Sequence, residues 1–288
     1  MYYSNGAKHI SEGVESYLSQ QRNQIPPANI FCLKLHNLFN GLPWGRILSI
    51  SGLPSSGKSL FLEMLKSEFL KDESIEILSF ELEMLIEDQI ERRAKYNTLD
   101  AISNQNLHYI DKLLTPAQII EQITAFAQSY VQPRGKKLIV TLDHTLMIKG
   151  DDEKKKIDAL MQGLVELKIE LHTLNIPASF VILSQLNRDI ENDSRVTNPF
   201  LHYPKKSDIF AASSVFYCSD YHFTVHRPKI ISGIGEYYGP PMEGYPRGLP
   251  TTKNGKDAVY VHVLKNRFGR LGVIAFYEDY ENAKIIEW

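Results

Sequence analysis

Gly52-Leu53-Pro54-Ser55-Ser56-Gly57-Lys58-Ser59 is the stretch that decides the fold, because it matches the G-x-x-x-x-G-K-[ST] pattern of a phosphate-binding P-loop. The flanking segments agree with this pattern. An apolar run over residues 46–51 predicts a buried strand before the loop, and apolar residues at helical spacing over 60–66 predict a helix after it. Strand, glycine-rich loop and helix, in that order, form the context that the motif requires.

The residue types in this loop suit the binding of a nucleotide. Gly52 and Gly57 allow tight turns that direct successive backbone N–H groups toward one point, where the helix N-terminus adds partial positive charge. Lys58 is predicted to contact the β- and γ-phosphates, and the Ser59 hydroxyl to hold Mg²⁺. The predicted phosphate-binding residues are Gly52, Ser55, Ser56, Gly57, Lys58, Ser59 and Leu60.

The composition is that of an ordinary globular protein, with 288 residues, 43% hydrophobic and 23% charged. A formal net charge of −2 gives no general attraction to nucleic acid, so any nucleic-acid surface must be local. Cys32 and Cys218 are far apart and outside any metal-binding spacing, which favours a reducing compartment without disulfides. The N-terminus lacks an apolar signal segment and no apolar run is long enough to span a bilayer. We therefore expect a cytoplasmic protein with no membrane contact.

Predicted strands alternate with predicted helices along most of the chain, which indicates an α/β protein with a mostly parallel sheet and crossover helices. After the P-loop unit, strands are expected over 75–80, 107–110, 137–143 and 178–183, and helices over 85–96, 115–130 and 157–174. The segment 150–156 is expected to be a charged loop, and 228–257 a long excursion. Strands expected over 221–225, 259–264 and 271–277 have no helices between them. They suggest an antiparallel edge that includes a hairpin across 268–270.

Residues 1–28 are expected to form an N-terminal helix and linker, and residues 29–288 the main domain. The helix is predicted over 8–22 from its amphipathic pattern, and Pro26-Pro27 ends it with a stiff linker. This helix could fold back on its own domain or dock on a neighbouring subunit, and the sequence leaves both arrangements open.

Four residues with carboxylate or amide side chains follow predicted strands, on the edge of the sheet that carries the P-loop. They are Glu81, Glu83, Asp143 and Gln185. Ligands of such sheets bind at the carboxyl ends of the strands, so we expect these side chains to share one site. Asp143 follows the apolar run 138–142, which is a Walker B pattern. It is therefore predicted to hold Mg²⁺ together with Ser59, and capping of the next helix is the alternative.

Hydrolysis of a bound nucleotide requires a group that positions or deprotonates the attacking water. Glu81 and Glu83 are both candidates, and each could instead be a solvated charge at a strand end. Gln185 could contact the γ-phosphate through its amide or could be an ordinary turn residue, and the spacing does not choose between these roles.

Taken together, these segments resemble the ATPase domain of the DnaB-type replicative hexameric helicases, a branch of the RecA-like P-loop family. The resemblance covers about residues 29–280 in the family's order. It implies a RecA-like core, a mostly parallel sheet flanked by helices and completed by antiparallel edge strands. The segments that carry it are the P-loop unit 46–59, Phe-Glu-Leu-Glu-Met over 80–84, the Walker B run 138–143, Leu-Ser-Gln-Leu-Asn-Arg over 183–188 and Lys-Asn-Arg-Phe-Gly over 265–269.

The resemblance implies a role for several residues. Glu83 matches the catalytic glutamate of the family, and Gln185 matches the glutamine that couples the γ-phosphate to the DNA-contacting loops. Lys265 and Arg267 match the basic pair that reaches into the ATP site of the neighbouring subunit. Arg227, which follows a predicted strand, resembles an arginine on the nucleotide side.

The resemblance also implies ATP and Mg²⁺ as cofactors, single-stranded DNA as substrate, a ring-shaped homo-oligomer, most simply a hexamer, and other replication proteins as partners. The segments 149–156 and 188–207 fall where the family has its DNA loops. Cations there could contact phosphates, or could lie on a solvated face. They are Lys154, Lys155, Lys156, Arg195, Lys205 and Lys206.

The sequence departs from the family pattern in several places. Glu81 replaces a serine, His144 stands where a tyrosine is common, and 208–220 lacks acidic residues usual in the family. About 30 residues precede the core, so the family's N-terminal domain is not expected in this chain. Two other functions therefore stay open. One is a RecA-like DNA-binding protein or helicase loader that is switched by ATP and does not unwind. The other is a P-loop assembly protein that does not bind DNA.

Overall fold

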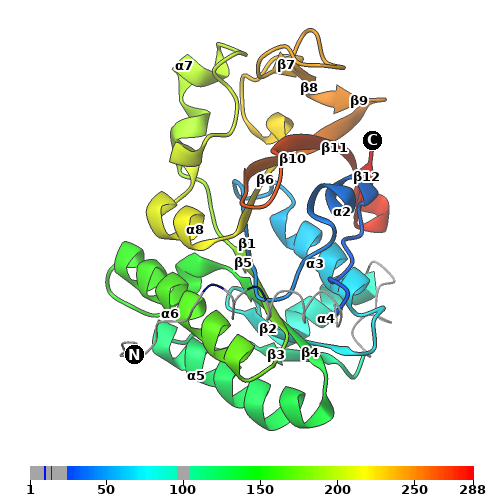
Figure 1. The fold of residues 1–288 in the computed structure, drawn as a ribbon. Coiled ribbons are helices and arrows are strands. Elements are labelled where there is room, and N and C mark those ends of the chain that lie inside the picture. The colour runs from blue at the N-terminus through cyan, green and yellow to red at the C-terminus, as the bar shows by residue number, and fades with distance from the viewer. Residues whose placement is uncertain (1–9, 11–13, 15–24, 96–103) are drawn as a thin grey trace.

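A sheet of ten strands forms the centre of the computed structural model, and helices cover both of its faces (Figure 1). The structure describes residues 25–95 and 104–288, together with Ile10 and Val14. The helix expected over 8–22 lies outside the described residues apart from these two positions. No helix in the described part of the chain is long and apolar enough to cross a membrane.

The parallel part of the sheet has the strand order β6-β1-β5-β4-β2-β3. With the antiparallel strands included, β1, the strand before the P-loop, lies at the middle of the sheet. These strands are β1 (Ile47–Ser51), β2 (Ile75–Glu81), β3 (Leu107–Ile110), β4 (Lys137–Asp143), β5 (Ala178–Leu183) and β6 (Tyr221–His226). Every residue of β1, β2, β5 and β6 is buried, as expected for parallel strands covered on both faces.

The antiparallel edge predicted from the sequence is confirmed. β10 (Lys256–Asn266) pairs antiparallel with β6, and the β10–β11 hairpin is closed by the predicted turn. The remaining strands of this edge are β9 (Thr252–Lys253), β11 (Gly272–Asp279) and β12 (Lys284–Glu287). The excursion between β6 and β10 contains a separate two-stranded sheet, β7 (Tyr237–Tyr238) with β8 (Leu249–Pro250).

Helices pack on the two faces of the sheet and form a separate apolar core on each (Figure 1). α2 (Leu33–Phe39) and α3 (Lys58–Phe69) share a core with side chains from one face, and α5 (Pro116–Phe126), α6 (Glu153–Thr173) and α8 (Ala212–Cys218) share a core with the other. Thr115 and Gln118 form the predicted capping box at the start of α5. The other described α-helices are α4 (Ile86–Lys95) and α7 (Asp193–Val196).

Local predictions were wrong for one loop and missed two short helices. The segment 150–156 is not a loop throughout, because α6 begins at Glu153 and the Asp152 side chain caps it by accepting from the Lys155 N–H at 2.9 Å. Lys154, Lys155 and Lys156 therefore lie on the first turn of a helix. The sequence analysis also missed α2 and α8, seven-residue helices that are too short to show a clear apolar period.

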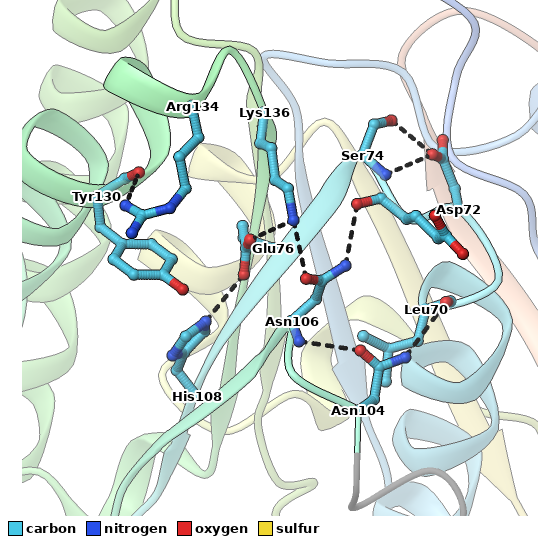
Figure 2. A network of polar contacts seen from close by, with 11 residues as sticks. Leu70, Asp72, Ser74, Glu76, Asn104, Asn106, His108, Tyr130, Arg134 and Lys136 are labelled. Atoms are coloured by element: carbon cyan, nitrogen blue, oxygen red, sulfur yellow. Dashed lines mark hydrogen bonds and ion pairs between the residues drawn. The ribbon is translucent and has the colours of Figure 1, made fainter.

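A buried carboxylate joins the amino ends of β2, β3 and β4, at the edge of the sheet opposite the P-loop (Figure 2). Glu76 accepts from Lys136 Nζ at 2.7 Å and lies 2.8 Å from His108 Nε2. Lys136 also donates to the side-chain oxygen of Asn106 at 2.8 Å. The network satisfies a charge that is only 1% exposed, so we assign it to stability of this edge.

Candidate active site

The P-loop links β1 to α3 with the geometry that its glycines require. Gly57 adopts a φ of 95° as the N-cap of α3, a conformation that other residues rarely reach. Gly52 meets a different constraint, because an added Cβ would lie 2.5 Å from both the Val225 carbonyl oxygen and Ser56 Oγ. The start of the loop therefore packs closely against β6, and α3 begins at Lys58.

Lys58 is buried within the site, and its Nζ donates to the Leu53 carbonyl at 2.8 Å. Burial lowers the pKa of Lys58 to about 8, and the carboxylates of Asp143 and Glu83 oppose that shift. Two negative groups therefore already face this ammonium from neighbouring strands. An anion that bound here would favour the charged form further.

Asp143 and Ser59 lie together, as the predicted metal pair requires. Burial raises the pKa of Asp143 to about 6, with a further contribution from Glu81, while a hydrogen bond from Ser59 lowers it. Asp143 Oδ1 is buried and has no hydrogen-bond partner in the described part of the chain. A hydroxyl beside an unpartnered carboxylate oxygen is the donor set that Mg²⁺ takes in P-loop sites, so these residues fit the ion.

Glu81 and Glu83 have different surroundings, although they are two residues apart. The Glu81 side chain is 2% exposed and forms an ion pair with Lys66, which is also buried. Ser79 and Gln89 donate to the same carboxylate at 2.6 and 3.1 Å. Glu83 lies beyond the end of β2, and its side chain is 52% exposed. Of the two carboxylates, only that of Glu83 is available to a water molecule at this edge.

His144 is a member of the site that the sequence analysis did not assign to it. Its Nε2 lies 3.3 Å from Glu83 Oε2 and 3.3 Å from the side-chain amide of Gln185. Burial lowers the pKa of His144, and Lys58 acts in the same direction, whereas Glu83 opposes it. The signal that could have found it is its position, directly after Asp143 at the end of β4.

Lys265 and Arg267 lie at the other edge of the sheet, away from the P-loop of the same chain. Arg267 Nη1 is 3.2 Å from Asp220 Oδ1, and the Asp220 carboxylate also accepts from the Ile47 N–H at the start of β1. β1 has five residues and thus separates this point from the P-loop by roughly 16 Å. Lys265 Nζ donates to the Phe216 carbonyl at 2.6 Å, at the end of α8.

Asp220 is fully buried and has a second cation, because Lys168 Nζ lies 3.1 Å from its Oδ2. Arg267 is therefore not the sole charge partner of this carboxylate. The Arg267 side chain remains 49% exposed at the surface. About half of this side chain is therefore accessible to another molecule, although one guanidinium nitrogen contacts Asp220.

Arg227 follows β6 at the P-loop edge of the sheet, but it contacts carboxylates of the same chain. Its Nη2 lies 2.7 Å from Asp257 Oδ2 and 2.8 Å from Glu278 Oε2. The family resemblance implies a place for this arginine on the nucleotide side. In the structure it joins the end of β6 to β10 and β11.

The cations of the two predicted DNA loops differ in accessibility. Lys154, Lys155, Lys205 and Lys206 are exposed, whereas Lys156 is half-buried and donates to the Leu146 carbonyl at 2.8 Å. Arg195 is also half-buried, and both terminal nitrogens bind Asp208, at 2.7 and 2.9 Å. Arg195 is therefore neither on a solvated face nor a free cation, because its pair with Asp208 lies within the chain and holds the 188–207 segment together.

Comparison with known proteins bears on the fold. No model of a protein family and no curated protein matches the sequence. The structure is similar to a solved ATPase domain, with 17% identity, a TM-score of 0.75 and coverage of 99% of this chain and 100% of that one. It is also similar to a DnaB-like replicative helicase, described with its primase interactions, at 17% identity and a TM-score of 0.74 over 98% of this chain and 67% of that one.

A third similar structure is the KaiC-like protein PH0186 from Pyrococcus horikoshii OT3, with 12% identity, a TM-score of 0.59 and coverage of 91% of this chain and 98% of that one. Its lower TM-score sets the first two structures apart from this more distant match. The fold expected from the sequence motifs is confirmed: the chain has the RecA-like fold of the DnaB-type ATPase domains.

Proposed function

We propose that the protein is a Mg²⁺-dependent ATPase that moves along single-stranded DNA as a ring-shaped oligomer. The observation that carries the ATPase part is the convergence of four strand ends. Lys58 and Ser59 follow β1, Glu83 follows β2, Asp143 ends β4 and Gln185 follows β5, all at one edge of the sheet. This edge joins a phosphate-binding loop to a metal pair and an accessible carboxylate.

Each residue has a separate task in this proposal. Lys58 binds the β- and γ-phosphates, and Ser59 with Asp143 would hold Mg²⁺, which when bound neutralises negative charge on the phosphates. Glu83 orients the attacking water and accepts its proton, because its carboxylate is accessible at the P-loop edge. Gln185 responds to the γ-phosphate through its amide. Glu81 has a structural task, since its charge is neutralised by Lys66.

The oligomeric part of the proposal rests on the position of the basic pair. Arg267 is too far from the P-loop of its own chain to act there, yet its guanidinium is exposed. We infer that Arg267 and Lys265 complete the ATP site of a neighbouring copy through a head-to-tail interface. Such interfaces close into a ring, most simply a hexamer, as the DnaB-type resemblance implies. Replication proteins are the expected partners of such a ring.

The DNA part of the proposal rests on the exposed lysines of the two loop segments. Lys154, Lys155, Lys205 and Lys206 present positive charge on a protein whose net charge is −2. Lysines of this kind bind the DNA backbone without reading sequence. The protein is therefore expected to bind single-stranded DNA of any sequence.

The decisive experiment is ATP hydrolysis with and without single-stranded DNA, combined with the mass of the protein in solution. Stimulation by DNA and an ATP-dependent oligomer would support the proposal. Hydrolysis without any effect of DNA would favour the assembly protein. DNA binding without strand displacement on a forked duplex would favour the ATP-switched loader. Absence of ATP binding would overturn all three.

A further inference from the structure

His144 occupies the space between the two polar residues that follow β2 and β5. Its side chain is only 3% exposed, and its Nε2 lies 3.3 Å from both Glu83 Oε2 and the Gln185 amide. In the part of the chain that the structure describes, the Glu83 carboxylate has no other hydrogen-bond or ion-pair partner. The position of the Glu83 side chain therefore depends on this histidine.

The orientation of the His144 ring is fixed from its other side. Nδ1 accepts from the backbone N–H of Leu146 at 3.3 Å, which places the hydrogen of the neutral ring on Nε2. Lys156 Nζ donates to the Leu146 carbonyl at 2.8 Å and braces the same turn from α6. A ring held in this way keeps Nε2, the nitrogen that carries its single hydrogen, beside Glu83 and Gln185.

One N–H between two side chains links their positions. The Gln185 atom that lies 3.3 Å from His144 Nε2 is the amide nitrogen Nε2, and two N–H groups cannot bond to each other. We therefore assign the Gln185 amide with its oxygen toward the ring. The Glu83 carboxylate lies at ion-pair distance, 3.3 Å, from the same ring nitrogen. The amide oxygen and the carboxylate thus share one hydrogen, and a movement of either side chain changes the contact that the other can make. Hydrogen-bond networks of this kind couple their members, so that removing one changes the contribution of the next.

We propose that His144 is a positioning residue that couples the Glu83 carboxylate to the Gln185 amide, so that the γ-phosphate contact of Gln185 and the orientation of the attacking water are set together. The proposal rests on the ATPase function proposed above. His144 does not contact the reacting atoms in this scheme. It acts by holding Glu83, and it should influence turnover more than nucleotide binding.

Two substitutions separate this role from the structural role of the residue. His144→Asn keeps an oxygen that can accept from the Leu146 N–H, but its side chain is too short to reach Glu83. His144→Gln places an amide N–H at about the reach of Nε2. We expect kcat for ATP to fall about 10- to 100-fold in His144→Asn and to recover substantially in His144→Gln. The Kd for ATP and the melting temperature should stay near wild-type values in both.

A double-mutant cycle tests the coupling itself. If His144 links the two residues, Gln185→Ala should lower kcat much less in the His144→Asn background than in the wild type. His172→Asn, on the exposed face of α6, is the matched control and should leave kcat unchanged. Additive effects of His144→Asn and Gln185→Ala, or equal losses in His144→Asn and His144→Gln, would overturn the coupling.

The failure of this proposal differs from the failure of the proposed function. If the wild-type protein does not hydrolyse ATP, or if Glu83→Gln hydrolyses it normally, the assignment of the site is wrong. The proposed role of His144 is then overturned as well. If the wild type is active and Glu83→Gln is inactive, but His144→Asn turns over like the wild type, only the role of His144 is overturned.

Discussion

Two glutamates in one short segment illustrate how burial separates a structural charge from a reactive one. Glu81 ends β2 inside the protein, where Lys66 of α3 neutralises it. Glu83 lies just beyond the strand, where solvent reaches its carboxylate. The same side chain can therefore have opposite functions at positions two residues apart.

Substitution of each glutamate by glutamine tests this division. Glu83→Gln should bind ATP with normal affinity, keep the stability of the wild type and lose nearly all hydrolysis, because only the water-positioning carboxylate is removed. Glu81→Gln removes the buried charge partner of Lys66, which keeps Glu63 at 2.9 Å, and should lower the free energy of unfolding by about 2 kcal/mol.

Urea denaturation and steady-state hydrolysis, measured on both variants at a temperature where both are folded, check these expectations. Normal hydrolysis by Glu83→Gln, together with an inactive but stable Glu81→Gln, would reverse the assignment of the pair.

At the scale of elements, we expect the exposed lysines of the two loop segments to supply the contacts to single-stranded DNA. We expect Lys205→Ala/Lys206→Ala to weaken binding of single-stranded DNA and to reduce the slope of log affinity against log salt by about 1.4, if each lysine neutralises one phosphate. Fluorescence anisotropy over a salt series measures that slope. Lys71→Ala/Lys284→Ala removes the same charge from exposed positions elsewhere and should leave the slope unchanged.

The outcome depends on the slope and not on affinity alone. An unchanged slope for Lys205→Ala/Lys206→Ala, and for the lysines at the start of α6, would show that these segments do not contact the DNA backbone. A loss of affinity with an unchanged slope would point to a structural disturbance of the 188–207 segment.

The elements that the sequence predicted well are those whose signals are local. The P-loop between an apolar strand and a helix is one, and the Thr115 capping box of α5 is another. What could not be predicted depends on contacts between distant segments. The choice between Glu81 and Glu83 is decided by Lys66, which lies on a different element, and no spacing rule joins them.

The candidate site shows the same limit. Lys58, Ser59, Asp143 and Gln185 were expected at one edge because parallel strands bring their carboxyl ends together, and the structure has them there. His144 was noted only as a departure from a family pattern, because its contacts to Glu83 and Gln185 exist only after three strands have aligned. Asp220, which holds Arg267, escaped notice for the same reason.

At the scale of the whole molecule, the arrangement of Arg267 can be tested by mixing subunits. Arg267→Ala should keep nucleotide binding and lose most hydrolysis, by about 10³-fold for an arginine that stabilises transferred phosphate in trans. Arg270→Ala removes an exposed charge from the same turn and should have little effect. Lys58→Ala should be inactive because it lacks the phosphate-binding cation.

Mixing the two inactive proteins distinguishes action in trans from action in cis. A Lys58→Ala subunit retains Arg267, and an Arg267→Ala subunit retains its P-loop. In an equal random mixture, about one interface in four therefore pairs an intact P-loop with an intact Arg267. Single-turnover hydrolysis should reappear after subunit exchange. Its absence from a verified mixed oligomer would exclude the trans role, and wild-type turnover by Arg267→Ala would exclude any catalytic role.

Stability of the whole domain should depend on pH through its buried histidines. Burial lowers the pKa of His222 and His262 to about 3 and of His202 to about 4, and it lowers that of His226 well below 6.5. Unfolded chains bind these protons near pH 6.5, whereas the folded protein does not. Stability is therefore fully present above this pH and falls as the pH decreases, by up to about 1.4 kcal/mol per pH unit for each histidine.

Urea denaturation between pH 7.5 and about 5 measures this loss. Asp143 has the opposite effect on stability. Its pKa is raised in the folded protein, so this one group adds stability as the pH falls, against the four histidines that remove it. His262→Gln should flatten the pH dependence, whereas His172→Gln, at an exposed position, should not change it. A stability that is constant over this range would contradict the assignment of these histidines as buried and neutral.

The P-loop and Arg267 lie at opposite ends of β1. If Arg267 acts in trans, no single chain contains a complete catalytic centre. An open row of subunits always has one centre fewer than it has chains, and only a closed ring has as many centres as chains. Dilution alone would then switch the protein off, without an inhibitor or a modification. Closure of the ring would complete the last centre in a single step. The rate of turnover per chain would therefore depend on the protein concentration.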